Sequence, residues 1–354
     1  MMAAKKQYYD ISNMLKTEAQ FMMLLGQRTN GKSYQAKKTL IEKAYDEGEK
    51  FVYIRRWDRE VKASVAANYF DDCPISTITN GKYDSAYARQ GAIYLVNSQS
   101  DKMLDDKFLV GYYISLNRAV TVKSNVFPDV SWAVFEEFIT DDAYLYDEPN
   151  KLQQLVSTYF RNNQGHVILV GNTISRVCPY FTHWCLEGVL RQKQGTIEVY
   201  HHHASEGDIV DIAVENCEAV EKKSNMFFGS VEKQIVSGEW ETRDVPHLPG
   251  EYIDFDVVYE VEVIYQMFKF CLQLMVEPKE GGVFVYVYPL TKKRKIYRII
   301  QDEFSTLPNV TSRLDPSIRP EAVMIDCFRI DKVCYANNLC GADFNHVLNE
   351  LKIF

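Results

Sequence analysis

The feature that most constrains the fold is a stretch of eight residues, GQRTNGKS, from Gly26 to Ser33. It fits the pattern G-x-x-x-x-G-K-[ST] of a phosphate-binding loop, whose backbone N–H groups surround a polyphosphate. A short apolar run, residues 21–25, precedes the loop and predicts a buried strand. Residues 33–47 carry apolar side chains at the spacing of an amphipathic helix. The pattern requires this strand–loop–helix context, so we predict an α/β domain with a phosphate site here.

The residue types in the loop suit a nucleoside triphosphate with its metal ion. The two glycines allow sharp turns, Lys32 can reach the β- and γ-phosphates, and the Ser33 hydroxyl can bind Mg²⁺. The N-terminus of the following helix adds partial positive charge. The alternative is a glycine-rich turn without a ligand. We therefore expect ATP and Mg²⁺ as cofactors, with the nucleotide held by Gly26, Gln27, Arg28, Thr29, Asn30, Gly31, Lys32 and Ser33.

Length and composition limit the class of protein. The 354 residues indicate about two domains of ordinary globular composition. No apolar run reaches the roughly 18 residues of a membrane span, so we expect no membrane partner. The eight cysteines are scattered without a C-x-x-C pair, which favours reduced thiols in a cytoplasmic protein. The net charge of −8 argues against indiscriminate nucleic-acid binding, but not against transient contact through local cations.

A second motif lies in residues 132–139, where an apolar strand ends in the adjacent carboxylates Glu136 and Glu137. The first is placed to hold Mg²⁺ directly or through its waters, and the second to orient and deprotonate an attacking water. Both roles require a twist at the strand end, because adjacent strand residues point to opposite faces. Position 136 departs from the usual pattern, since Asp is usual there and Glu is one methylene longer. The alternative is a solvated carboxylate pair.

Other polar residues follow predicted elements of the same domain. Arg161 ends a predicted helix, where it either projects into a neighbouring subunit or favours the helix dipole. Asn172 follows a predicted strand, where a polar side chain can sense the γ-phosphate. Arg55 and Arg56 end another strand and face either phosphates or a surface ion pair.

These motifs carry a family resemblance. The series GQRTNGKS, YIRR, VKSNVFPDV, VFEEFI, YFRNN, LVGN and PYF, in this order and spacing, resembles the DNA-encapsidation ATPases of small tailed podophages, the phi29-like phages. The resemblance covers about residues 8–200. It implies an ASCE-type P-loop NTPase domain with a mixed or parallel sheet and flanking helices. It also implies a homomeric ring, a pentamer, on the procapsid portal with a packaging RNA. Such a motor pumps double-stranded DNA into the procapsid in the host bacterial cytoplasm.

The resemblance also implies roles for single residues. Arg28 matches an arginine inside the loop, Glu137 matches the catalytic glutamate, and Glu136 stands where the family has Asp. Arg161 matches an arginine finger that acts in the neighbour's site, and Lys123 matches a second such cation. The expected catalytic residues are thus Glu137, Arg161, Lys123 and Asn172, and the expected metal ligands are Ser33 and Glu136.

Three segments are predicted from the second half. We expect an ATPase domain at residues 1–203, with its last strand at residues 196–200. A helical linker is predicted at residues 204–245, and a C-terminal domain with strands of a mixed sheet at residues 246–354. Family resemblance implies that this smaller α+β domain is RNase H-like, has lost its nuclease site, and docks on RNA or the procapsid.

Two clusters in the C-terminal domain leave alternatives open. Asp254, Asp256 and Asp326 can form a two-metal cluster only if they converge, and otherwise are exposed carboxylates. The basic run at residues 291–295 binds RNA phosphates or is a solvated turn.

Other function classes also remain open: another ring-forming translocase or helicase, a small-molecule kinase, a terminase with an active nuclease, or an RNA-docking component with incidental ATPase activity. A kinase would not need Glu137 to activate water, and a docking component would tolerate Lys32→Ala.

Overall fold

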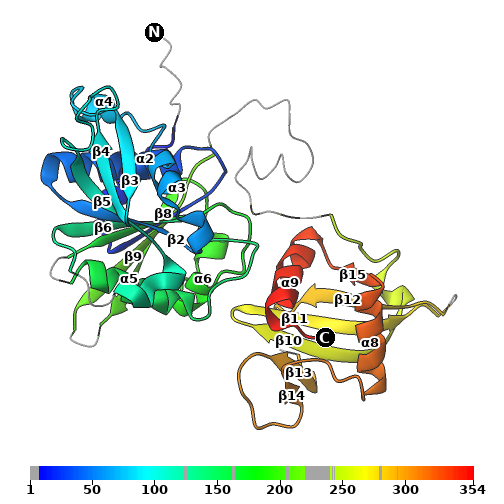
Figure 1. The fold of residues 1–354 in the computed structure, drawn as a ribbon. Coiled ribbons are helices and arrows are strands. Elements are labelled where there is room, and N and C mark those ends of the chain that lie inside the picture. The colour runs from blue at the N-terminus through cyan, green and yellow to red at the C-terminus, as the bar shows by residue number, and fades with distance from the viewer. Residues whose placement is uncertain are drawn as a thin grey trace. The chain divides into compact units, whose positions relative to one another are not determined.

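The computed structural model describes residues 8–122, 126–161, 164–204, 207–219, 240, 242, 244–278, 281–292 and 294–354. The chain divides into two units, coloured along the sequence in Figure 1. The first contains Met1–Thr173 and Gly188–Phe227, and the second contains Ile174–Glu187 and Trp240–Phe354. In the described ranges, every helix is too short or too polar to cross a membrane.

A large mixed sheet forms the first unit. Its strands are β1 (Phe21–Leu25), β2 (Lys50–Arg55), β3 (Ser85–Arg89), β4 (Ala92–Val96), β5 (Phe108–Ser115), β6 (Val130–Glu136), β7 (His166–Val170), β8 (Thr196–His203) and β9 (Ile209–Asn216). Among the described residues, their order is β3-β4-β5-β2-β6-β7-β1-β9-β8. The strands from β5 to β9 run parallel, and antiparallel β3, β4 and β8 extend the two edges. This arrangement confirms the predicted mixed α/β fold.

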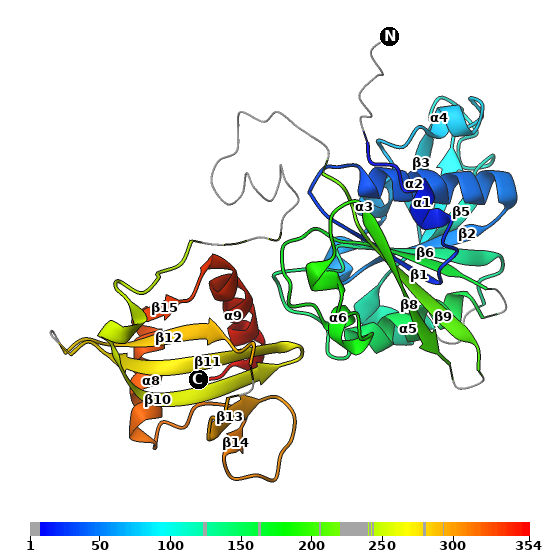
Figure 2. The ribbon, with the colours of Figure 1, turned by 180° about the vertical axis from the view of Figure 1, so that it is seen from behind.

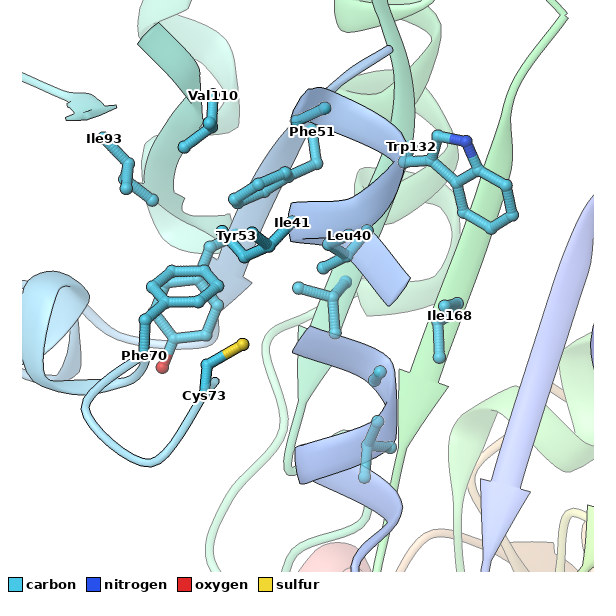
Figure 3. Packing of buried hydrophobic residues seen from close by; sticks show 14 of the residues in the cluster. Leu40, Ile41, Phe51, Tyr53, Phe70, Cys73, Ile93, Val110, Trp132 and Ile168 are labelled. Atoms are coloured by element: carbon cyan, nitrogen blue, oxygen red, sulfur yellow. The ribbon is translucent and has the colours of Figure 1, made fainter. Parts of the chain in front are cut away.

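Helices cover this sheet on both faces, as the two opposite views show (Figure 1, Figure 2). The helices of the first unit are α1 (Ser12–Leu15), α2 (Lys32–Glu42), α3 (Ala63–Asn68), α4 (Ile75–Ile78) and α5 (Glu148–Tyr159). Helix α2 buries Leu40 and Ile41 in a cluster with Phe51 and Tyr53 of β2 (Figure 3). Because the far end of α2 is anchored in this core, its first residues are held at the carboxyl edge of the parallel strands.

One predicted segment is corrected by the structure. Residues 204–245 were expected to form a helical linker, but β9 lies inside this range as a strand of the sheet. It pairs in parallel with β1 and antiparallel with β8, so residues 196–200 do not form the last strand of this unit. The segment was misjudged because its acidic residues obscure the alternation of IVDIAVEN, and because the partner β1 lies far away in sequence. Residues 220–239, also in the expected linker, fall outside the described residues.

A second, smaller sheet forms the core of the C-terminal unit. Its strands are β10 (Asp256–Tyr265), β11 (Phe268–Val276), β12 (Val283–Pro289), β13 (Arg298–Gln301), β14 (Val310–Thr311) and β15 (Val333–Tyr335). Their order within the described ranges is β14-β13-β10-β11-β12-β15, with both parallel and antiparallel pairs. Helices α8 (Arg319–Arg329) and α9 (Asn338–Leu351) contact β12, and α6 (Pro179–His183) also belongs to this unit. The unit is therefore the smaller α+β domain that the sequence predicts.

Candidate nucleotide site

The loop of residues 26–31 turns between β1 and α2 through two left-handed glycines. Gly26 has a φ of +141° and Gly31 a φ of +102°, which side chains other than hydrogen rarely adopt. A Cβ placed on Gly31 would lie only 2.7 Å from the Cβ of Tyr8. Glycine at position 31 is thus required both by backbone conformation and by the chain segment that passes over the loop.

Lys32 is the first residue of α2, and its side chain turns back into the loop. Its Nζ donates to the carbonyl oxygens of Gly26 at 3.2 Å and Gln27 at 2.7 Å, and to Oδ1 of Asn30 at 3.2 Å. Oδ1 of Asn172, just beyond β7, lies 3.4 Å from the same Nζ. The side chain is 3% exposed, and this burial lowers the pKa of Lys32 to about 8. A cation is therefore held inside the ring of loop atoms, where an anionic ligand is expected.

Ser33, Glu136 and Tyr69 meet beside this lysine. The Ser33 hydroxyl donates to Oε2 of Glu136 at 3.0 Å, and the Tyr69 hydroxyl donates to Oε1 at 2.6 Å. Glu136 is 6% exposed, and burial raises its pKa although both hydrogen bonds oppose that shift. Burial is also the first cause that raises the pKa of Tyr69, which keeps this hydroxyl a proton donor. A hydroxyl and a carboxylate are oxygen ligands of the kind that Mg²⁺ prefers, so the donor set fits this ion.

Glu137 stands outside the sheet. Its φ of +58° is left-handed, which turns the chain directly after β6. Glu136 is therefore buried while the Glu137 side chain is exposed. This geometry supplies the twist that two neighbouring carboxylates with separate roles require. Nη2 of Arg55, at the end of β2, lies 2.6 Å from Oε2 of Glu137.

Arg56 has a different environment from its neighbour. It is 4% exposed and donates through Nε and Nη2 to the fully buried carboxylate of Glu148, at 2.8 and 3.0 Å. It also donates through Nη1 to the carbonyl oxygen of Glu137 at 3.1 Å and through Nη2 to that of Phe138 at 2.8 Å. The sequence predicts that Arg56 faces either phosphates or a surface ion pair. The structure shows neither, because Arg56 forms a buried ion pair with Glu148.

The other predicted residues are placed as follows. Arg28 and Thr29 lie on the exposed outer side of the loop. Arg161 is exposed directly after α5. Lys123 lies outside the described residues. The structure therefore brings Lys32, Ser33, Glu136 and Asn172 together, whereas Arg161 stands at a helix end.

Residues outside the sequence motifs also frame the loop. Tyr9 donates its backbone N–H to the carbonyl oxygen of Asn30 at 2.8 Å and its hydroxyl to Oε1 of Glu215 at 2.7 Å. The rings of Tyr8 and Tyr34 stack at 4.1 Å. From the sequence, Tyr8 and Tyr9 ahead of the first strand either stack on a nucleotide base or simply pack against the protein. Glu215 gave no signal because it belongs to β9, which was not predicted.

Two of the three carboxylates expected to form a metal cluster in the C-terminal unit, Asp254 and Asp326, have separate partners. Oδ2 of Asp254 accepts the backbone N–H of Glu251 at 3.0 Å, and the exposed Asp326 pairs with Arg329 at 3.4 Å. Across the described ranges, no group of three or more His, Cys, Asp or Glu side chains is arranged to hold a metal ion. In the basic run, Lys293 lies outside the described residues, and Arg294 contacts the Glu260 carboxylate at 2.7 Å.

Fold and site together define a mixed α/β protein with a strand–glycine loop–helix unit inside a large, mainly parallel sheet. The family model described as podovirus DNA encapsidation protein (Gp16) matches residues 3–231, and the chain belongs to this family. The DNA packaging protein of Bacillus phage B103 is 30% identical over 177 residues, or 49% of this chain and 50% of that protein. The DNA packaging protein of Bacillus phage phi29 is 30% identical over 181 residues, with 50% of each chain covered. The matched stretch thus spans about half the length of these relatives.

A solved structure extends the likeness of fold over both units. The bacteriophage phi29 viral genome packaging motor assembly contains a chain with a TM-score of 0.58 and 20% sequence identity. The match covers 98% of this chain and 100% of that one.

Proposed function

We propose that this protein is the ATPase of a DNA-packaging motor, which binds ATP with Mg²⁺ and couples hydrolysis to movement of double-stranded DNA into a procapsid. The observation that carries the proposal is the meeting of Lys32, Ser33 and Glu136 at the carboxyl edge of the parallel strands. Ligands bind at this edge in open α/β sheets. Membership of the DNA encapsidation family supports the choice of cargo.

Each residue of the site has a chemical part in this function. Lys32 exchanges its loop oxygens for the β- and γ-phosphates, and the backbone N–H groups of residues 26–31 surround the chain of phosphates. Ser33 and Glu136 hold Mg²⁺, which neutralises charge on the phosphates. Glu137, exposed at the end of β6, orients and deprotonates the attacking water. Asn172, beside Lys32, is placed to sense the γ-phosphate.

The assembly is a homomeric ring, a pentamer, that binds a portal and a packaging RNA in the host cytoplasm. Arg161 acts in the neighbour's site as an arginine finger, and Lys123 is the second cation acting there. The exposed position of Arg161 after α5 supports this role. The C-terminal unit is a nuclease-like fold without a working site that docks on RNA or the procapsid.

The decisive experiment is ATP-driven uptake of DNA by purified procapsids, with and without packaging RNA. We expect protection of DNA from added nuclease only when protein, ATP and RNA are all present. ATP turnover that does not respond to DNA would instead indicate a kinase or another unrelated P-loop enzyme.

Glu137→Gln tests the chemical step. The amide cannot accept the proton of the attacking water, so we expect ATP to bind with near-normal affinity while turnover falls at least about a hundredfold. Equilibrium binding of ATP and release of phosphate measure the two properties separately. Turnover near the wild-type rate would show that Glu137 is not the catalytic base.

A further inference from the structure

Tyr69 is a residue of the candidate metal site that no sequence motif marks. It follows α3, far along the chain from both Ser33 and β6, yet its hydroxyl donates to Oε1 of Glu136 at 2.6 Å. We propose that Tyr69 is a positioning residue that fixes the Glu136 carboxylate for Mg²⁺ binding. This inference rests on the proposed function, because it assumes that Mg²⁺ binds at Ser33 and Glu136.

The tyrosine is itself held firmly from two sides. Its ring stacks on the ring of Tyr53 of β2, with centroids 4.3 Å apart and an angle of 19° between the planes. Nζ of Lys37, one turn after the loop on α2, donates to the Tyr69 carbonyl oxygen at 2.8 Å and lies 4.8 Å from the ring centroid. The hydroxyl is therefore presented to Glu136 by a ring that is fixed by both the sheet and the helix after the loop.

Glu136 needs the hydrogen bond from Tyr69 because its side chain is one methylene longer than that of aspartate. A glutamate has one more rotatable bond than the aspartate usual at this position, so its carboxylate can take more orientations and loses more freedom when a metal binds. In the structure, Oε2 faces the Ser33 hydroxyl and Oε1 faces Tyr69. Tyr69 thus binds one oxygen and leaves the other directed toward Ser33, the second expected metal ligand. Hydrogen-bond partners that orient metal-binding carboxylates typically change metal affinity ten- to hundredfold.

The test is binding of ADP to the full chain, measured by calorimetry with excess Mg²⁺ and again with EDTA. The gain in affinity from Mg²⁺ is the readout, and no hydrolysis is involved. For Tyr69→Phe we expect this gain to fall about ten- to hundredfold, with ADP affinity in EDTA unchanged. Tyr45→Phe is the matched control, since this ring packs against Tyr83 and Phe108 in the same unit, and its gain should equal that of the wild type.

A second pair of variants separates positioning from packing. The shorter side chain of Glu136→Asp cannot reach the Tyr69 hydroxyl, so adding Tyr69→Phe to it should change the Mg²⁺-dependent gain less than about twofold. An unchanged gain in Tyr69→Phe, or an equal loss of affinity with Mg²⁺ and with EDTA, would overturn the inference. If wild-type protein binds no ADP in either condition, the proposed function itself fails, and this outcome is distinct from the first two.

Discussion

Burial of the Lys32 ammonium group has an energetic cost, but it also favours binding of a phosphate ligand. An ammonium group in a nearly dry position is costly, and the lowered pKa expresses that cost. Part of this cost is offset by hydrogen bonds that the ammonium group donates to the carbonyl oxygens of Gly26 and Gln27 and to Oδ1 of Asn30. A bound polyphosphate would place full negative charge beside the ammonium group in place of these dipoles. Burial destabilises the charged form of Lys32 when no ligand is bound, but it also strengthens the attraction between the ammonium group and a phosphate, because water screens the two charges less.

The lowered pKa predicts a pH dependence of stability. The folded-state pKa of about 8 lies below the ordinary value of 10.5, so between these pH values the unfolded chain holds a proton that the folded chain has lost. The free energy of unfolding should therefore rise with pH across this window because of Lys32, by at most about 3 kcal/mol. The measurement is the difference in urea unfolding between wild type and Lys32→Met at pH 8 and pH 10.5. A difference that stays constant would show that Lys32 is not desolvated.

Site residues that lie in continuous motifs could be predicted from the sequence. Those that reach the site from distant parts of the chain could not. The loop residues and the pair Glu136–Glu137 were predictable because each motif is continuous in sequence and lies at a strand end. Tyr69 and Glu215 were not, because they reach the site only through tertiary packing of other elements. The buried ion pair of Arg56 was not predicted, because nothing near it in the sequence identifies Glu148 as its partner.

At the scale of elements, the Arg56–Glu148 pair joins three of them. Arg56 directly follows β2, and its guanidinium binds two carbonyl oxygens after β6 and pairs with Glu148, the first residue of α5. Glu148 also accepts the backbone N–H of Leu145 at 2.9 Å. The left-handed turn at Glu137 is therefore fixed by the same ion pair that fixes the start of α5, the helix that ends just before Arg161.

Breaking this pair predicts a large loss of stability. Glu148→Ala leaves the Arg56 charge buried with its carboxylate removed, and such losses are typically about 3–5 kcal/mol. The double variant Arg56→Met/Glu148→Met removes both charges, and we expect it to be more stable than Glu148→Ala alone. Urea unfolding of the three proteins measures the difference. Glu148→Ala with wild-type stability would mean that water reaches Arg56 and replaces its partner.

Elements were predicted unevenly for physical reasons. Strands β1, β2 and β7 were found because they are short apolar runs bounded by polar residues. The strand β11 was not predicted, although seven of its nine residues are buried, because its Lys and Gln interrupt the apolar pattern. Strand β9 was missed because it pairs with a strand near the other end of the domain.

For the whole molecule, the proposed ring predicts that activity can be restored by mixing two inactive variants. A Lys32→Ala subunit keeps Arg161, and an Arg161→Ala subunit keeps its loop, so a mixed ring contains complete sites at some interfaces. Arg161→Ala alone should lower turnover about 10³–10⁵-fold with little change in ATP affinity. ATPase activity of mixtures at several ratios measures the effect. Failure to recover activity in rings shown to be mixed would place Arg161 in its own subunit's site or in a structural role.

We expect the C-terminal unit to have no nuclease activity. Purified protein with Mg²⁺ or Mn²⁺ should leave supercoiled plasmid intact, because in the part of the chain that the structure describes no group of three or more His, Cys, Asp or Glu side chains is arranged to hold a metal ion. Gel electrophoresis detects single nicks. Nicking that disappears in Asp256→Ala would make the protein a terminase with a working nuclease.

The position of β9 has a consequence for synthesis on the ribosome. β1 carries the loop and lies between β7 and β9, so its second edge stays open until residue 216 has been made and has left the ribosomal exit tunnel. Gly26 also packs against Cys217, which follows β9. During that interval the nascent chain presents an apolar, unpaired strand edge to other chains. The loop at residues 26–31 is therefore made early, but the sheet beside it is completed only when β9 has been made. Growth temperature and translation rate should affect the yield of this protein more than the yield of chains whose strands pair with neighbours close in sequence.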